Sequence, residues 1–343
     1  MKNEVFLENE SIKKLNKLIQ KSRLHFYKPI QIAEILFHHR TEKSINLNTL
    51  ESYRNISKKW RDNVTSKLVG SISTSSQKFQ DNIFDKNAIS PHTLNELGKI
   101  NEESGEVEKY IYRLISLKFE NLEKIVNLCK DKKNFDLKKL IDTARNDNDL
   151  KRSIDKVYEV IVYSLMSELL KDLELNIKLE ISSKKIDEKY MKYTQSFLNF
   201  DTKKKTTAKV FRAGVANAAD GGIDLWSNFG WVIQVKHLNL DKETFKKIIK
   251  RQDCEKIIIV CREIDFDHKN ELKKLNNDKV SILNERDLID IYKVVMQDNQ
   301  LIDDFLHKII KNLNEEFPMI GNKNSIDKFF LSRGYISQIK GTQ

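Results

Sequence analysis

The sequence contains few cysteines, prolines and glycines, and it lacks any long hydrophobic run. Three cysteines without a C-x-x-C spacing exclude a disulfide framework and a thiolate zinc site. Three prolines and ten glycines argue against long irregular linkers. No apolar stretch approaches the roughly 18 residues of a membrane span, and the N-terminus has no apolar signal segment. These absences predict a globular cytoplasmic protein with no segment inserted in a membrane.

Positive charge is present in excess. Lysine and arginine outnumber the acidic residues, and the formal net charge is +11. Such an excess favours a polyanionic partner, either nucleic acid or an anionic membrane surface, because released counterions drive the binding. A lysine-rich composition inherited from the source genome explains the same excess. Charge alone therefore leaves the partner open.

The pattern of apolar residues changes near residue 153. Before it, helical spacing predicts helices at 11–21, 29–39, 50–70 and 106–130. After it, a long helix at 153–173 precedes strands and helices in alternation. We expect strands at 176–181, 207–212, 222–226, 231–236, 256–261 and 279–283, and helices at 241–252, 268–276 and from about 285. The pattern predicts an α/β fold with a mixed sheet.

Three regions follow from this change of pattern. Residues 1–150 form a mainly helical region. Residues 151–300 form the α/β core, and residues 301–343 form a C-terminal helical extension.

The segment 220–237, Asp-Gly-Gly-Ile-Asp-Leu-Trp-Ser-Asn-Phe-Gly-Trp-Val-Ile-Gln-Val-Lys-His, carries the candidate chemistry. In a strand over 231–236, Gln234 and Lys236 point to one face, and a tight hairpin brings Asp224 beside it. A carboxylate, an amide oxygen and an ammonium then suit phosphodiester hydrolysis assisted by Mg²⁺. Asp220 competes with Asp224 but is interpreted as a structural turn residue. An ordinary hairpin with a solvated lysine explains the same residues.

A basic segment between residues 54 and 80 is a second candidate site. Its side chains can bind DNA phosphates and base edges, although a solvated helix and a polar loop explain the same composition. The candidate DNA-binding residues are Arg54, Lys58, Lys59, Arg61, Ser73, Ser75, Ser76, Gln77, Lys78 and Gln80. Arg212 and Asn217, shortly before Asp224, are further candidates.

Asp224, nine intervening residues and then Gln234-Val-Lys236 resemble the D-(x)n-(D/E)-x-K signature of PD-(D/E)XK nucleases. Glutamine departs from the usual acid, but Mrr-like branches also carry Q-x-K beside a similar Gly-Gly-x-Asp. The resemblance implies a restriction endonuclease-like mixed-sheet core. It further implies Mg²⁺ held at Asp224, Gln234 and Val235, with Lys236 as the catalytic lysine.

In such families an acid on the preceding helix often completes the site. Glu159 matches that place, and Glu168 on the same helix is the alternative. The choice between these two glutamates stays open at this stage.

Further strings are similar to the HaeII family of type II restriction enzymes. They are Tyr27-Lys-Pro-Ile-Gln-Ile-Ala-Glu-Ile-Leu36, Lys59-Trp-Arg-Asp62, Ser73-Thr-Ser-Ser-Gln-Lys-Phe-Gln-Asp81, Asp220-Gly-Gly-Ile-Asp224 and Asn228-Phe-Gly230. The resemblance implies cleavage of double-stranded DNA at a palindrome of the form RGCGCY. It also implies a homodimer and a cognate DNA methyltransferase in the host.

Two alternatives remain at this stage. One is an Mrr-like nuclease that restricts modified DNA. The other is a DNA-binding protein whose nuclease-like core is inactive because residue 234 is glutamine.

Overall fold

The protein divides into two compact units, which are described separately. The computed structural model describes residues 6–22, 26–70, 72–73, 80–147, 153–178, 192, 203–213, 222–251, 254–275, 279–321 and 323–335. A helical unit comprises 1–157 and 310–343, and a sheet-containing unit comprises 158–309. The chain passes between them inside α9 (Ile154–Leu170) and returns inside α14 (Asn299–Glu316).

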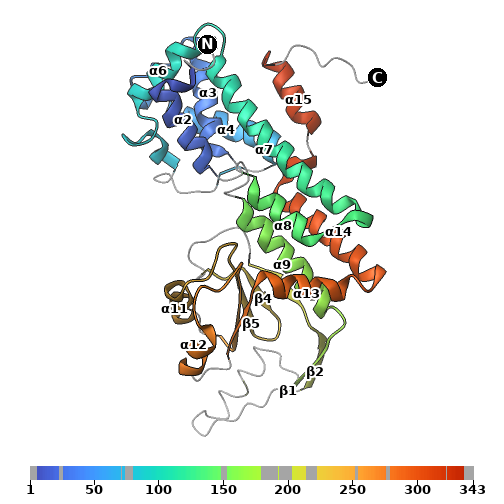
Figure 1. The fold of residues 1–343 in the computed structure, drawn as a ribbon. Helices are drawn as coiled ribbons and strands as arrows, with labels where there is room; N and C mark the ends of the chain where they lie inside the picture. Colours follow the sequence, from blue (N-terminus) through green and yellow to red (C-terminus); the bar gives the residue numbers. More distant parts are fainter. Residues whose placement is uncertain are drawn as a thin grey trace. The chain divides into compact units, whose positions relative to one another are not determined.

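Helices form the described part of the first unit (Figure 1). The α-helices are α2 (Glu10–Lys21), α3 (Tyr27–Glu42), α4 (Ile56–Val69), α6 (Pro91–Asn101), α7 (Glu106–Lys130), α8 (Leu137–Asn146) and α15 (Lys323–Ser332). Short 3₁₀ turns lie at η1 (Leu50–Ser52), η2 (Asn82–Phe84), η3 (Lys132–Asn134) and η4 (Pro318–Gly321).

Helix α3 is the centre of this unit. Every residue from Pro29 to Leu36 is buried, because α2, α4, α6 and α7 all pack against it. A helix enclosed on all sides is expected to be apolar throughout, yet α3 carries Gln31 and Glu34 in its buried part. Both polar side chains therefore need partners inside the unit.

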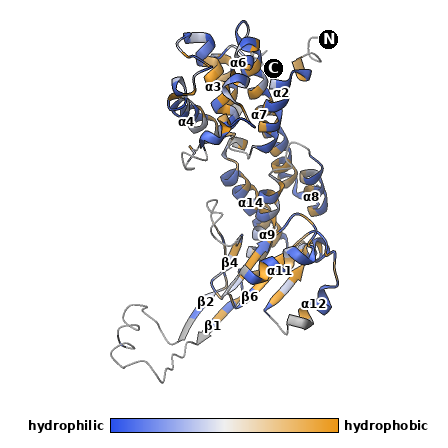
Figure 2. Cartoon of the chain, turned by 90° about the vertical axis from the view of Figure 1, so that its left-hand side faces the viewer, coloured by the Kyte–Doolittle hydropathy of each residue, from blue (hydrophilic) through white to orange (hydrophobic). Residues whose placement is uncertain are grey.

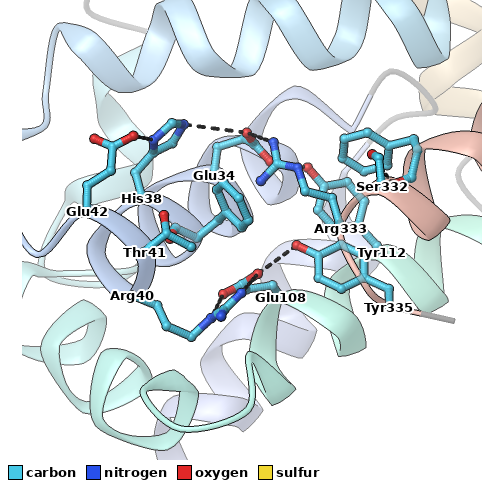
Figure 3. A network of polar contacts seen from close by, with 12 residues as sticks. Glu34, His38, Arg40, Thr41, Glu42, Glu108, Tyr112, Ser332, Arg333 and Tyr335 are labelled. Atoms are coloured by element: carbon cyan, nitrogen blue, oxygen red, sulfur yellow. Dashed lines mark hydrogen bonds and ion pairs between the residues drawn. The ribbon is translucent and has the colours of Figure 1, made fainter. Parts of the chain in front are cut away.

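Glu34 lies in a polar network that connects α15 to α3 and α7 (Figure 3). Its carboxylate accepts hydrogen bonds from Tyr112 (2.6 Å) and Arg333 (2.8 Å). The Arg333 guanidinium also lies 3.4 Å from the centre of the Phe37 ring. A second buried carboxylate, Glu108, accepts from Arg40, Asn101 and Tyr335. These contacts fix the C-terminal helix to the helical core.

The second unit contains two sheets. A two-stranded antiparallel sheet pairs β1 (Glu174–Lys178) with β2 (Lys203–Thr207). The larger sheet has the order β3-β4-β5-β6-β7, with β3 (Val210–Arg212), β4 (Leu225–Ser227), β5 (Trp231–Val235), β6 (Lys256–Val260) and β7 (Val280–Leu283). Strands β3, β4 and β5 pair antiparallel, whereas β5, β6 and β7 run parallel. The predicted α/β fold with a mixed sheet is confirmed.

Helices cover both faces of the larger sheet. Figure 1 shows α11 (Lys242–Arg251) and α12 (His268–Leu275) on one side, and α13 (Glu285–Val295) with the later part of α9 on the other. Phe245 and Ile248 of α11 pack on Ile257 and Ile259 of β6. Figure 2 shows β6 as hydrophobic, as expected for a strand buried on both faces.

Two sequence-based expectations need correction. The strand expected at 207–212 is two strands in different sheets, because the Ala208 amide bonds the Leu173 carbonyl (2.8 Å) and the chain turns there. The helix expected at 50–70 is a 3₁₀ turn followed by α4, so Arg54 precedes the helix.

Among the described residues, no helix has both the length and the apolar character needed to cross a bilayer.

The polar network yields a stability prediction. Burial raises the pKa of Glu34, and Arg333 opposes that effect. Arg333→Met should cost about 3–5 kcal/mol in the free energy of unfolding at pH 7, because it leaves a buried carboxylate without its cation. Adding Glu34→Gln should restore part of the loss, since an amide needs no counter-charge. Urea denaturation would measure both variants, and equal stability of the single and double variants would contradict the prediction.

The same network predicts how the free energy of unfolding changes with pH. The pKa of Glu34 in the folded state lies above the ordinary value, so its contribution to stability is present at low pH and declines as the pH rises through the folded-state pKa. The cost of Arg333→Met should therefore be smaller at pH 4 than at pH 7.

Candidate active site

Asp224 is tied to both neighbouring strands of the larger sheet. Its amide donates to the Ile233 carbonyl (3.3 Å), and its carbonyl accepts from the Ala213 amide (2.9 Å). Its carboxylate oxygen Oδ2 accepts a hydrogen bond from the Val235 amide at 2.7 Å. Three hydrogen bonds therefore hold Asp224 at the start of β4 and direct its carboxylate toward β5.

Gln234 lies opposite Asp224. Leu225 pairs with Ile233, and continuing this antiparallel register by one residue places Asp224 against Gln234 on the same face. The Gln234 side chain is only 6% exposed, and its Oε1 has no hydrogen-bond partner among the described residues. An unpaired buried oxygen costs about 1–3 kcal/mol. The arrangement therefore suits a ligand that this oxygen would bind.

Gly222 makes room for Gln234. It has a φ of +83°, and a Cβ atom built on it would lie 2.7 Å from Nε2 of Gln234. Only glycine combines this backbone conformation with such a close approach. Gly222 was not predicted as a site residue, although the Gly-Gly pair before Asp224 was the available signal.

Lys236 follows β5 on the face of Gln234. Its amide donates to the Val260 carbonyl of β6 (2.8 Å), so strand geometry continues through this residue. Residues two apart in a strand share a face, and the Lys236 side chain is half-buried. The backbone thus places Asp224, Gln234 and Lys236 on one face of the sheet.

Glu159 on α9 has a different partner. Its Oε1 accepts from Nε and Nη2 of Arg212 at 3.2 and 3.1 Å. Arg212 pairs with Leu225, so strand alternation places it on the face opposite that of Asp224 and Gln234. Two residues with predicted functions, Glu159 in the active site and Arg212 in DNA binding, are thus paired with each other.

Glu168, the alternative acid, contacts lysines outside the sheet. Its carboxylate lies 2.5 Å from the Lys308 ammonium of α14 and 3.1 Å from that of Lys171. Glu159 is therefore the glutamate of α9 that reaches the sheet.

The predicted DNA-binding segment has a mixed outcome. Arg54 and Lys58 both pair with Asp81, at 2.5 and 2.7 Å, whereas Lys59 is exposed. The prediction that Arg61 binds DNA needs correction. Arg61 is only 2% exposed, and its guanidinium donates hydrogen bonds to Gln31 and Asp62. It is an interior residue of the helical unit and not a surface contact.

Of the other candidates for DNA binding, Ser73 and Gln80 are half-buried. The remaining residues predicted to bind DNA, and the alternative aspartate, lie outside the described residues; they are Ser75, Ser76, Gln77, Lys78, Asn217 and Asp220.

The segments that carry the N-terminal resemblance meet in space. The Tyr27 hydroxyl donates to the Ile72 carbonyl (3.0 Å), and the Lys28 ammonium donates to Asn82 (2.5 Å). With Asp81 bound to Arg54 and Lys58, residues 72–73 and 80–82 are fixed to α3 and α4. No role was predicted for Asp81 from the sequence.

The residues present fit a metal site of low charge. Within the described ranges, no group of three or more histidine, cysteine, aspartate and glutamate side chains could hold a metal ion. Asp224 offers a carboxylate, and the unpaired Oε1 of Gln234 offers a neutral oxygen. The N–H and C=O of a strand residue point the same way, so the Val235 carbonyl also points toward Asp224. Such hard oxygen ligands suit Mg²⁺.

Comparisons with known proteins show the family of the chain. The family model described as HaeII restriction endonuclease matches residues 11–335. The type II restriction enzyme NgoBI of Neisseria gonorrhoeae is 39% identical over 341 residues, covering 96% of this chain and 97% of the relative. The type II restriction enzyme HaeII of Haemophilus aegyptius is 39% identical over 332 residues, covering 92% and 93%.

No solved structure matches the chain. The family match and both relatives span nearly all of the sequence, and they confirm the family that the sequence motifs indicated. The chain belongs to the HaeII restriction endonuclease family and is a site-specific endonuclease.

Proposed function

We propose that this enzyme hydrolyses both strands of DNA at a short palindrome of the form RGCGCY, with Asp224, Gln234 and Lys236 as its active site. The proposal rests on one observation above all. The 2.7 Å hydrogen bond from the Val235 amide holds the Asp224 carboxylate against β5, and the residues on either side of Val235 are Gln234 and Lys236. The order of the mixed sheet, preceded by α9, supports a PD-(D/E)XK core.

Asp224, Gln234 and the Val235 carbonyl would hold Mg²⁺. When bound, the ion polarises the scissile phosphate and lowers the pKa of a water molecule. The protein supplies a single negative charge from Asp224 and two neutral oxygens, so its own attraction for the cation is modest. Mg²⁺ usually completes its coordination with substrate phosphate oxygens and water. We therefore expect tight metal binding only when DNA is present.

Lys236 supplies a positive charge beside these oxygen ligands. Its ammonium can donate hydrogen bonds to the phosphate group or to the attacking water, and it offsets charge that develops on phosphorus. Asp224 supplies the carboxylate, and the Val235 amide holds that carboxylate in place. On this proposal, cleavage requires the side chains of both Asp224 and Lys236, whereas folding requires neither.

The remaining roles follow from the palindromic target. A two-fold homodimer would present equivalent half-sites to its two subunits. The helical region 1–150 is proposed to recognise DNA, with Lys59 exposed on α4. A cognate methyltransferase would protect the host genome, which places the enzyme beside that genome in the cytoplasm.

The neutral Gln234 supports one alternative, a DNA-binding protein with an inactive core. This alternative predicts salt-sensitive DNA binding without cleavage. Incubation of the purified protein with unmethylated phage DNA, with and without Mg²⁺, separates the two. Discrete Mg²⁺-dependent fragments support the proposal. Intact unmethylated DNA beside cleaved methylated DNA would indicate a modification-dependent nuclease instead.

The active-site assignment predicts the effect of two isosteric changes. Asp224→Asn keeps an oxygen for the Val235 amide, and Lys236→Met keeps the aliphatic side chain. Each should lower the rate of cleavage by at least about 100-fold, because a charge that acts in the transition state is lost. Gel-shift assays should show that DNA binding remains. Lys293→Met, at an exposed lysine of α13, is the control and should cleave normally. Full cleavage by Asp224→Asn or Lys236→Met would refute the assignment.

Gln234→Glu tests the metal site without measuring cleavage. A second carboxylate should strengthen cation binding in the absence of DNA, so Ca²⁺ should raise the melting temperature of this variant more than that of the unmodified protein. Adding Asp224→Asn should remove the difference. Identical Ca²⁺ responses in all three proteins would exclude residue 234 as a metal ligand.

Gly222→Ala tests the space beside Gln234. The new Cβ would displace the amide, so cleavage should fall by about tenfold or more. Gly334→Ala is a matched control, because Gly334 has a similar φ of +67° but no atom lies within 4 Å of the added Cβ. Both variants carry the backbone strain of an L-residue at positive φ. Equal cleavage rates in the two variants would show that the contact with Gln234 is unimportant.

A further inference from the structure

An aromatic cavity lies at the end of the larger sheet where β5, β6 and β7 begin. Its volume is about 470 Å³, within the usual range for ligand pockets. Trp226, Trp231 and Val232 line it from β4 and β5, and Cys254, Glu255 and Lys279 line it from the segments that precede β6 and β7. None of these residues belongs to the candidate active site.

The aromatic rings of this cavity are held in place by other rings. Trp226 is 45% exposed, although its ring stacks on Phe211 with centroids 4.4 Å apart and planes at 22°. Trp231 contacts Phe229 edge to face, with centroids 4.7 Å apart. An indole that is rigid on one side and open on the other is suited to stack on a second flat ring.

The cavity lies near the candidate active site in the same unit. Trp226 pairs with Val232, and strand alternation places both on the face of Gln234. From Trp231 to Lys236 is five residues of extended chain, or about 16 Å. DNA bound at Lys236 therefore extends within reach of Trp226.

We propose that this cavity binds an unstacked nucleobase of the DNA substrate, with the base stacked on Trp226. Glu255 can accept a hydrogen bond from an exocyclic amino group, and Lys279 can donate to a base or phosphate oxygen. Aromatic side chains bind bases of any sequence in this way, because every base has a π-face. The inference rests on the proposed function only in taking DNA as the ligand.

The test uses single-stranded oligonucleotides without metal, so that it does not depend on cleavage. A labelled oligonucleotide and an abasic strand of equal length and charge are compared by fluorescence anisotropy. Trp226→Ala should weaken binding of the oligonucleotide about tenfold and leave the abasic strand unaffected. Trp226→Phe should retain most of the affinity, because it preserves a ring. Equal affinity of the unmodified protein for the two strands would overturn the proposal.

Cys254 provides a second readout at the cavity itself. It is partly exposed, whereas Cys129 and Cys261 are buried and burial raises the pKa of each thiol to about 12. Alkylation should therefore occur mainly at Cys254, with the other two thiols as internal controls. The oligonucleotide should slow this reaction, and the abasic strand should not.

Other outcomes separate this inference from the proposed function. Binding of duplex DNA without any protection of Cys254 by single strands would overturn the nucleobase site and leave the endonuclease proposal intact. Protection that rises with protein concentration in the absence of DNA would show that a second copy of the chain covers the cavity, and would also overturn it. Failure to bind any DNA would contradict both.

Discussion

The hydrogen bond between the Asp224 carboxylate and the Val235 amide is the interaction on which the candidate site depends. It forms where β5 exchanges its antiparallel partner β4 for continued pairing with the parallel strand β6. The residue pairs of β4 and β5 end at Leu225. Next to that end, the Val235 amide donates to the Asp224 side chain, whereas within a ladder it would donate to a main-chain carbonyl. The end of a strand pair thereby fixes an acidic group in space.

The neighbouring contacts follow from this constraint. Gln234 lies opposite Asp224 in the register of β4 and β5, and glycine at position 222 leaves room for its amide. The buried Oε1 then faces no hydrogen-bond donor among the described residues. A polar atom placed at such cost is expected where a ligand binds, since structural amides in protein interiors are almost always paired.

Much of the sheet could be predicted from the sequence, because its central strands carry strong local signals. The apolar run 256–261 and the alternation over 231–236 predicted β6 and β5, and the same alternation placed Gln234 and Lys236 on one face. Pairing over long sequence separations could not be predicted. Arg61 lies in a basic segment, yet it is buried against Gln31, thirty residues away. Likewise, nothing local to Glu159 indicated that Arg212 would be its partner.

The neutral glutamine would give the proposed site a charge balance that connects metal binding to DNA binding. Asp224 and Lys236 carry opposite charges, and Gln234 adds none, so the protein attracts a cation less strongly than two carboxylates would. At the proposed site, a bound phosphodiester would contribute the missing negative charge and oxygen ligands, and Lys236 would favour its approach. On this proposal we expect metal and substrate to bind more tightly together than apart. For an endonuclease, such coupling would confine activation of water by a metal to the complex in which a phosphodiester is already in place.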